Sequence, residues 1–376
     1  MRAEDRPPGG SALSVRQLNR ATLARQMLLA RERVTAPRAI ETLVGLQAQF
    51  PRPPFLGLWA RVVGFERKDL KKLLLQRKVV RGTFLRGTLH VATAKDFVAL
   101  RPAMQPVLDA GMRTILRALR ARVDPERLSA RAREVLAEGP QTFEQIRDRL
   151  KREMPGTNER ALGFAVRMLL PLVQVPEGED APWAFVGKPR FALADEWLGK
   201  PIPTEAREVP DGLVLRYLAA YGPASVADLQ AWCGLQPLRE KVDALRSRLV
   251  TFRDERGREL FDLPGAPRPD ADVPAPVRLV ADYDNLVTTR ADERFVAKSH
   301  RPRGFLPGLR IAATVLVDGF VAGTWRSDRK KDVATLTVEP FAPFPARERR
   351  EVSAEAEALL RFAEPDARSY EVRVGK

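Results

Sequence analysis

Apolar and polar positions alternate through residues 211–263 in an order that predicts three helices followed by a β-hairpin. Helical spacing of the apolar residues is found in three consecutive segments, 211–221, 226–233 and 238–249. Ser225 stands where a side-chain cap would begin the second helix. Two strand-like runs then surround residues 254–257, which end in the glycine that hairpin turns favour. This order is typical of a winged helix.

The preceding segment repeats the same order. Helical spacing recurs in 125–138, 143–154 and 159–169, and strand-like runs follow in 172–178 and 183–193. Thr142 and Asn158 stand at the cap positions of the second and third helices. A Gly-Pro pair lies just before Thr142 and again just before Ser225, so the two junctions align. Two matched units at this spacing indicate an internal repeat.

The first third of the chain is a larger variant of the unit. Its helical segments are predicted at 14–29, 37–47, 55–62 and 68–77, with Ser14 as the first cap. Strand-like runs at 79–84 and 87–93 surround a tight turn at Leu85 and Arg86. We expect this hairpin to be the wing of the unit.

The last segment changes character after a Pro/Asp-rich linker at 267–276. Alternating, β-branched runs predict a small antiparallel sheet or partial barrel, and they cover 277–287, 311–326 and 333–341. A charged amphipathic helix is predicted at 346–363 and a closing strand at 369–374.

These patterns predict an α+β protein, mainly α, with three tandem winged helices and a C-terminal antiparallel β subdomain. At 376 residues, two to four domains are expected. We place the boundaries at a disordered tail (1–13), three winged helices (14–124, 125–204 and 205–266), and a β subdomain with one helix (267–376).

Positive charge is concentrated in the first unit. The whole chain carries 64 Lys and Arg against 48 Asp and Glu, a net charge of +16. Residues 1–124 hold 24 basic and 9 acidic residues (+15), which leaves 40 basic and 39 acidic residues (+1) in the remainder. A localised basic field is typical of a polyanion binder, although a solvated surface gives the same composition.

The composition argues against several other classes of protein. A single cysteine, Cys233, excludes an internal disulfide and a thiolate zinc site. His90 and His300 are the only histidines, and nothing around them has metal-ligand spacing, so we expect no metal. The N-terminus has no apolar core of signal-peptide type, and no stretch reaches the ~20 apolar residues of a membrane span. We expect a cytoplasmic, nucleoid-associated protein with no membrane contact.

Gln47-Ala48-Gln49 is the candidate chemical motif. The predicted helix before it is followed by prolines at 51, 53 and 54, which cannot continue a helix. Two amides two positions apart share one side of an extended segment, so both could converge on one target at a helix exit. An amide offers a donor and an acceptor and does not titrate near neutrality, which suits it to hold a water or a base edge. Capping or solvation is the ordinary alternative for such a short motif.

Several phrases of the chain together resemble the bacterial winged-helix DNA glycosylases typified by AlkZ. They are residues 18–26, 43–49, 57–62, 86–97, 171–176, 283–286, 291–294 and 314–325. The resemblance runs from about residue 14 to the C-terminus. It implies three winged helices and a β subdomain around a concave DNA-binding face, and excision of N7-alkylated purines, in some members from interstrand crosslinks. The Gln-apolar-Gln signature of one branch of that family matches Gln47-Ala48-Gln49.

The implied chemistry explains why amides alone could suffice. An N7-alkylpurine is already cationic, so its glycosidic bond is weakened without an acid. The enzyme must position a water and stabilise an oxocarbenium-like sugar, which oriented carbonyl dipoles can do. We expect Gln49 to hold the water and Gln47 to orient it or support the sugar, although these roles could be exchanged. No cofactor is required, and the lack of a lysine in the motif predicts a monofunctional enzyme.

Candidate DNA contacts lie around the motif and the predicted wing. They are Arg52, Arg81, Arg86, Thr88, His90 and Asn285. His90 could equally be a structural histidine, and Asn285 could only shape a turn. The expected partner is double-stranded DNA with alkylated purines, bound by a monomer.

Two other functions stay open at this point. A winged-helix regulator without enzymatic activity is the first alternative, because fold does not fix function. A nuclease is the second, although it needs clustered carboxylates for metal ions, and those of the first third are scattered. The adduct, the base-flipping step and the biological setting (general repair or self-resistance in a toxin producer) are not determined by the sequence.

Overall fold

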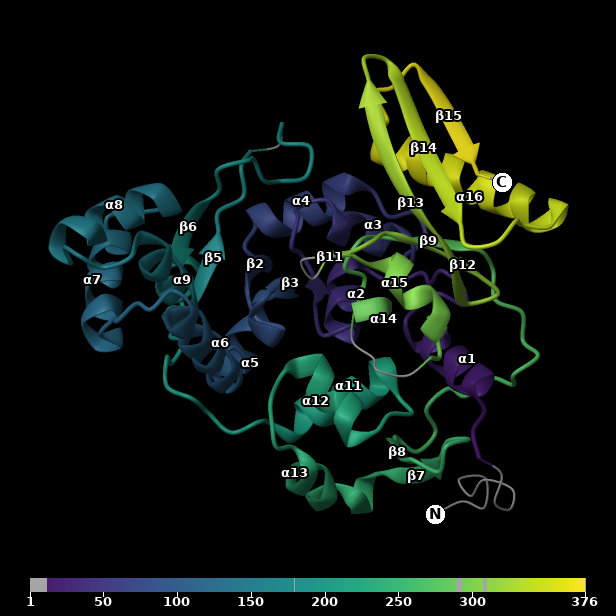
Figure 1. The fold of residues 1–376 in the computed structure, drawn as a ribbon, viewed down its shortest axis with the longest axis horizontal. Coiled ribbons are helices and arrows are strands. Elements are labelled where there is room, and N and C mark those ends of the chain that lie inside the picture. The colour runs from purple at the N-terminus through teal and green to yellow at the C-terminus, as the bar shows by residue number, and fades with distance from the viewer. Residues whose placement is uncertain (1–11, 179, 289–292, 307–309, 376) are drawn as a thin grey trace.

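The computed structural model describes residues 12–178, 180–288, 293–306 and 310–375, which form an α+β fold (Figure 1). The first unit contains these helices: α1 (Val15–Arg25), α2 (Ala36–Thr42), α3 (Pro53–Trp59), α4 (Arg67–Leu75), α5 (Ala94–Leu100) and α6 (Gln105–Ala118). Its strands are β1 (Leu46–Gln47), β2 (Val79–Thr83) and β3 (Leu89–Thr93). The predicted hairpin is confirmed, and the 3₁₀ helix η2 (Leu85–Gly87) forms its turn.

The second and third units show the predicted order of helices and hairpin. The second contains α7 (Pro125–Ala137), β4 (Gln141–Thr142), α8 (Phe143–Glu153), α9 (Glu159–Leu169), β5 (Leu172–Gln174), β6 (Arg190–Leu193) and α10 (Ala194–Leu198). The third contains α11 (Asp211–Tyr221), α12 (Val226–Cys233), α13 (Arg239–Ala244), β7 (Val250–Arg253) and β8 (Glu259–Asp262). The predicted caps are confirmed, because the side chains of Thr142, Asn158 and Ser225 each accept a backbone N–H in the first helical turn.

The first two units share one continuous sheet, whose strands come from both sides of the predicted boundary at 124/125. The six strands lie in the order β1-β3-β2-β5-β6-β4, with β2 antiparallel to β5. Gly82 permits this pairing, because a Cβ there would lie 2.7 Å from the carbonyl oxygen of Leu172 and 2.9 Å from the ring of Phe97. The short strand β1 forms the edge of this sheet.

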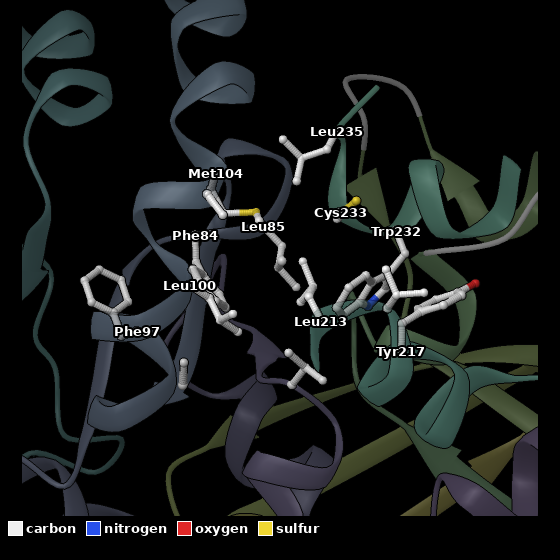
Figure 2. Close-up of a cluster of buried hydrophobic side chains, with 14 of the residues drawn as sticks. Phe84, Leu85, Phe97, Leu100, Met104, Leu213, Tyr217, Trp232, Cys233 and Leu235 are labelled. Atoms are coloured by element: carbon white, nitrogen blue, oxygen red, sulfur yellow. The ribbon is translucent and has the colours of Figure 1, made fainter. Parts of the chain in front are cut away.

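The third unit packs against the hairpin turn of the first. One apolar cluster joins both units (Figure 2). The first unit contributes Phe84, Leu85, Phe97, Leu100 and Met104, and the third contributes Leu213, Tyr217, Trp232, Cys233 and Leu235. Burial of this much apolar surface fixes the turn against α12. The hairpin is therefore not a free wing.

The C-terminal sheet differs from the prediction in one strand direction. Its order is β15-β14-β13-β12-β9, and its strands are β9 (Arg278–Val280), β12 (Thr314–Val317), β13 (Phe320–Lys330), β14 (Val333–Pro340) and β15 (Ser369–Val374). The predicted antiparallel pairing is confirmed for β9, β12, β13 and β14 but is wrong for the closing strand β15, which runs parallel to β14. The helix α16 (Ala346–Ala363) crosses over between them and packs on the sheet, as a parallel connection requires.

Short elements complete the C-terminal part. They are α14 (Asn285–Thr288), α15 (Arg301–Gly304), β10 (Phe305–Leu306) and β11 (Arg310–Ile311), with 3₁₀ turns at Pro102–Met104, Arg246–Arg248 and Lys298–His300. The predicted strand at 277–287 is wrong beyond Val280. Tyr283 has a φ of 58°, and the Asp284 carboxylate accepts the Leu286 N–H at 2.9 Å, which begins a helical turn.

Part of the predicted tail is ordered. Residues 1–11 lie outside the described residues. So do residues 291 and 292, which begin the segment 291–294 that resembles the family named above. The Leu13 N–H donates to the carbonyl of Arg253 at 2.8 Å, so the chain start is joined to the third unit. Among the described residues, no helix is long and apolar enough to cross a membrane.

Candidate active site

The motif lies on a strand edge and not at a helix exit. The prediction that a helix runs through Gln47 is wrong, because α2 ends at Thr42. The Gly45 N–H donates to Ile40 O and the Val44 N–H to Glu41 O, which is the bonding pattern of a Schellman motif. Val44 is β-branched and yet has a φ of 56°, a strained conformation of the kind that clusters at functional sites. The turn redirects the chain into β1.

Gln47 is held from its side chain. It is 8% exposed and lies opposite His90 on β3, so the two side chains share one face of the sheet. Nη2 of Arg86 donates to its Oε1 at 2.7 Å. A guanidinium carries only donors, so this bond fixes the amide with Oε1 toward Arg86. The Nε2 group of Gln47 is therefore the part that can donate to another molecule.

Gln49 lies beyond the end of the strand, and its side chain is exposed. The side chain forms no hydrogen bond within the described part of the chain, whereas the backbone around it is fixed. Arg81 donates to the carbonyl of Ala48 through Nε at 3.0 Å and Nη2 at 2.8 Å, and to the carbonyl of Gln49 at 3.2 Å. The result is a free amide on a fixed backbone, next to an oriented one.

The C-terminal segment 283–285 holds the backbone at Gln47. Asn285 donates from Nδ2 to the carbonyl of Gly45 at 2.7 Å, and its Oδ1 accepts the Gln47 N–H at 3.3 Å. Asp284 forms a bidentate ion pair with Arg61, at 2.8 Å for both bonds, and both side chains are almost fully buried. These partners are more than 200 positions apart, so no local pattern in the sequence could reveal them.

The electrostatics around the motif keep its neighbours from titrating near neutral pH. Burial, together with the nearby charge of Arg86, lowers the pKa of His90 to about 3. His90 Nδ1 lies 3.1 Å from the carbonyl of Thr88, which can only accept, so this nitrogen carries the proton. Burial lowers the pKa of Arg86 to about 10, so that side chain stays charged at pH 7.

Comparisons with known proteins identify the family of this chain and a similar fold. The profile of the family described as DNA glycosylase AlkZ-like matches residues 40–362, a span that includes the motif and its partners. The chain belongs to the AlkZ-like DNA glycosylases. The structure of the Streptomyces sahachiroi DNA glycosylase AlkZ is similar, with a TM-score of 0.76 and 19% identity over 97% of this chain and 100% of that one. No curated protein matches the chain.

Several predicted DNA contacts of this AlkZ-like glycosylase are turned to the protein. Arg81 is 4% exposed and His90 1% exposed, and Asn285 is equally buried. Arg86, at the turn of the hairpin, donates to the carbonyl of Trp232 in the third unit as well as to Gln47. Arg81, His90 and Asn285 are therefore turned toward the motif and its surroundings, whereas Arg86 is only partly buried.

Two other candidates are more accessible. Thr88 is partly exposed and donates to the carbonyl of Leu85 at 3.1 Å. Arg52 donates to Oγ of Ser327 at 2.8 Å and stacks over Trp183 at 5.5 Å from the ring centroid. Burial lowers the pKa of Arg52. Arg52 thus joins the motif segment to strand β13 of the AlkZ-like fold.

A cavity of about 440 Å³ lies beside the motif between the first unit and the C-terminal sheet. Its walls include the aromatic residues Phe50, Tyr283 and Trp325 and the cations Arg52, Arg303 and Arg326. A second cavity beneath Gln47 measures only about 10 Å³, which is about one water and too small for a purine. Within the described residues, no group of three or more His, Cys, Asp or Glu side chains is placed to hold a metal.

Proposed function

We propose that this DNA glycosylase is monofunctional and excises N7-alkylated, cationic purines from duplex DNA. The observation that carries the proposal is the pair of amides at 47 and 49, one oriented by Arg86 and one free on a fixed backbone. Neither amide titrates near neutrality, and neither is a strong base. Such a site acts only on a leaving group that is already activated.

The two amides have different roles in the proposed reaction. Gln47 Nε2 donates to the oxygen of the attacking water, and Gln49 Oε1 accepts one of its hydrogens. The Gln49 carbonyl dipole also faces the developing positive charge on the sugar. Gln47 Oε1 is engaged by Arg86, which supports assigning the acceptor role to Gln49.

The proposed step balances without a cofactor. The C1′–N9 bond breaks with its electron pair going to the purine, which neutralises the charge of the alkylated ring. Water forms the new bond to C1′ and loses its proton to solvent. The products are a free alkylated base and an abasic site.

The exposed position of Gln49 supports action on bulky adducts and interstrand crosslinks. The amide lies at a sheet edge, and the cavity beneath Gln47 cannot enclose a base. A lesion that cannot be enclosed by the protein would still reach such a site. We further propose that the three helix–hairpin units are winged helices that together hold duplex DNA, and that a monomer acts on the nucleoid.

The test is base release from a duplex that contains one N7-methylguanine. Wild type should release free base and leave an alkali-labile abasic site without strand cleavage. Gln49→Ala and Gln47→Ala should lose about 10²-fold or more of the single-turnover rate, as oriented hydrogen-bonding groups at reaction centres do. Gln76→Ala is the matched control, because Gln76 is an exposed glutamine at the end of α4.

Three outcomes would contradict the proposal. A wild-type protein that binds the duplex but releases no base from either the methylated or a crosslinked substrate would indicate a DNA-binding protein without this chemistry. Equal rates for Gln49→Ala and Gln76→Ala would remove the paired amides from the mechanism. Strand cleavage through a covalent imine would show a bifunctional enzyme.

A further inference from the structure

The residue that follows the motif is an exposed aromatic side chain. Phe50 is 52% exposed, which is the highest exposed fraction of any large apolar residue in the described part of the chain. The other exposed large apolar residues are all aliphatic and lie outside the motif segment: Val15, Val63, Leu75 and Val186. A single exposed apolar residue is ordinary on a protein surface. Its place directly after Gln49 and the rigidity of its support distinguish Phe50.

The support comes from both sides of the chain. The Phe50 ring lies 6.1 Å from the ring of Tyr283 at an angle of 54°, and Tyr283 is 8% exposed. Tyr283 precedes Asp284, which is held by its buried ion pair with Arg61. Pro51 restricts the backbone of Phe50 to extended geometry. One side of the ring is therefore supported while the remainder faces solvent.

The surroundings of Phe50 suit a nucleic acid strand. Phe50 lines the cavity of about 440 Å³ together with Arg52, Arg303 and Arg326. Arg326 is paired with Glu339 but 67% of its side chain is exposed, and Arg303 donates to the carbonyl of Phe341 at 2.8 Å from an exposed position. Guanidinium groups of this kind can follow a phosphate backbone while an aromatic ring meets the bases.

We propose that Phe50 is a stacking wedge that enters the base stack of duplex DNA next to the lesion. This inference rests on the proposed function, because it takes Gln49 as the residue that meets the lesion sugar. Proteins that insert an apolar side chain at a base step unstack it and kink the duplex. The unstacking would bring C1′ of the lesion to the exposed amide without requiring an enclosed base pocket.

The experiment separates stacking from catalysis. Gln49→Ala, which should bind the duplex without releasing base, is compared with the double variant Gln49→Ala/Phe50→Ala. The other substitutions at 50 and 63 are made in the same Gln49→Ala background. The probe is a duplex with N7-methylguanine and a neighbouring 2-aminopurine, whose fluorescence rises on unstacking. Phe50→Trp should keep the rise, Phe50→Ala should lose most of it, and Val63→Ala should keep it as the matched exposed residue.

Single-turnover rates supply a second measurement with Gln49 intact. Phe50→Ala should release N7-methylguanine from the duplex about tenfold more slowly, while its rate on the single-stranded oligonucleotide stays within twofold of wild type. A wedge matters only where a stack must be opened.

Each contrary result has a definite meaning. An unchanged fluorescence rise in Phe50→Ala would overturn the proposal, and so would equal losses of rate on duplex and single strand, which would indicate a packing role. Absence of base release by wild type would refute the proposed function, and the fluorescence measurement alone would then decide whether Phe50 inserts.

Discussion

Arg86 joins the third unit to the side chain of Gln47. Its guanidinium donates to Oε1 of Gln47 at 2.7 Å and to the carbonyl of Trp232, at the end of α12. Helix C-termini carry partial negative charge, so α12 stabilises the guanidinium that orients the amide. The packing of the hairpin turn against the third unit is therefore connected, through Arg86, to the orientation of Gln47 and to the chemistry that we propose there.

Loss of this connection should lower the rate of base release. Arg86→Met leaves the Gln47 amide free to rotate. We expect the single-turnover rate to fall by about tenfold or more, while the DNA affinity is retained. Arg86→Lys should recover part of the rate, because an ammonium can still donate to Oε1 but lacks the fork that reaches both carbonyls.

Arg77→Met is the matched control for Arg86→Met. Arg86 has a φ of 56° and Arg77 a φ of 59°, and Arg77 likewise donates to the carbonyl of a tryptophan, Trp197, at 3.0 Å, but away from the motif. Comparable rate losses in both variants would show that Arg86 has no specific role in positioning Gln47.

The rate of base release should not depend on pH between about 6 and 9. Gln47 and Gln49 do not titrate, the pKa of the buried His90 is lowered to about 3, and the pKa of Arg86 is about 10. Single-turnover rates measured across this range, corrected for spontaneous depurination, provide the check. A bell-shaped profile, or a steep step near pH 7 that spontaneous depurination of the same duplex does not show, would indicate an acid or base of the protein that the two amides do not provide.

Folding stability, in contrast, should fall as the pH is lowered from 7 to 5. The pKa of His90 in the folded protein is about 3, below its ordinary value of 6.5, because burial and Arg86 disfavour the cation. The unfolded chain therefore binds a proton first as pH falls, and protonation favours unfolding. For one such group the free energy of unfolding should drop by about 2 kcal/mol over this interval.

Urea unfolding at pH 7 and pH 5 measures this difference. His90→Asn should be less stable overall but should lose most of the pH dependence. An equal pH dependence in wild type and His90→Asn would mean that other groups dominate, and the assignment to His90 would be wrong.

The buried pair of Arg61 and Asp284 should show strong coupling. Arg61→Met leaves the Asp284 carboxylate buried without its guanidinium partner, and such removal typically costs about 3–5 kcal/mol of stability. Arg61→Met combined with Asp284→Leu should cost clearly less than the sum of the two single changes. The exposed pair Arg347 and Glu351 is the control and should show a coupling of about 0.5 kcal/mol or less. Additive effects at 61 and 284 would contradict this prediction.

The sequence predicts those features of the fold that depend on neighbouring residues. Caps such as Ser225 and the hairpin around Leu85 follow from local hydrogen bonding and alternation. The end of α2 was not predictable in the same way. Leu43 and Val44 continue the helical pattern, and the helix stops only because Val44 adopts a positive φ when both residues are buried. Tertiary packing overrides the local preference there.

The site shows the same division. Gln47 and Gln49 are identified through the family resemblance, but their environment depends on contacts between distant segments. Asn285 bonds to Gly45 across 240 positions, and the direction of β15 depends on how α16 crosses the sheet. Arginines expected at phosphates, such as Arg81, are instead buried against the motif, because composition reports charge and not direction.

Asn285 offers a substitution that changes two atoms of the site and little else. In Asn285→Asp, the new carboxylate cannot donate to the carbonyl of Gly45, 2.7 Å away, although it can still accept the Gln47 N–H. Two oxygens at that distance repel, so β1 should shift from the hairpin edge that places Gln47 and Gln49. We expect the rate of base release to fall by about tenfold or more, because enzyme rates are sensitive to small misplacements of reacting groups. The DNA affinity should stay within about threefold of wild type.

The readout must separate positioning from loss of fold. Single-turnover release from an N7-methylguanine duplex gives the rate, fluorescence anisotropy with the same duplex gives the affinity, and urea unfolding gives the stability. Asn158→Asp is the matched control, because the Asn158 side chain accepts a backbone N–H at the start of α9 and an aspartate keeps that bond. If Asn285→Asp released base as fast as Asn158→Asp, the hydrogen bond to Gly45 would not position the motif. If affinity and rate fell together, Asn285 would act on DNA binding, as the sequence alone had suggested.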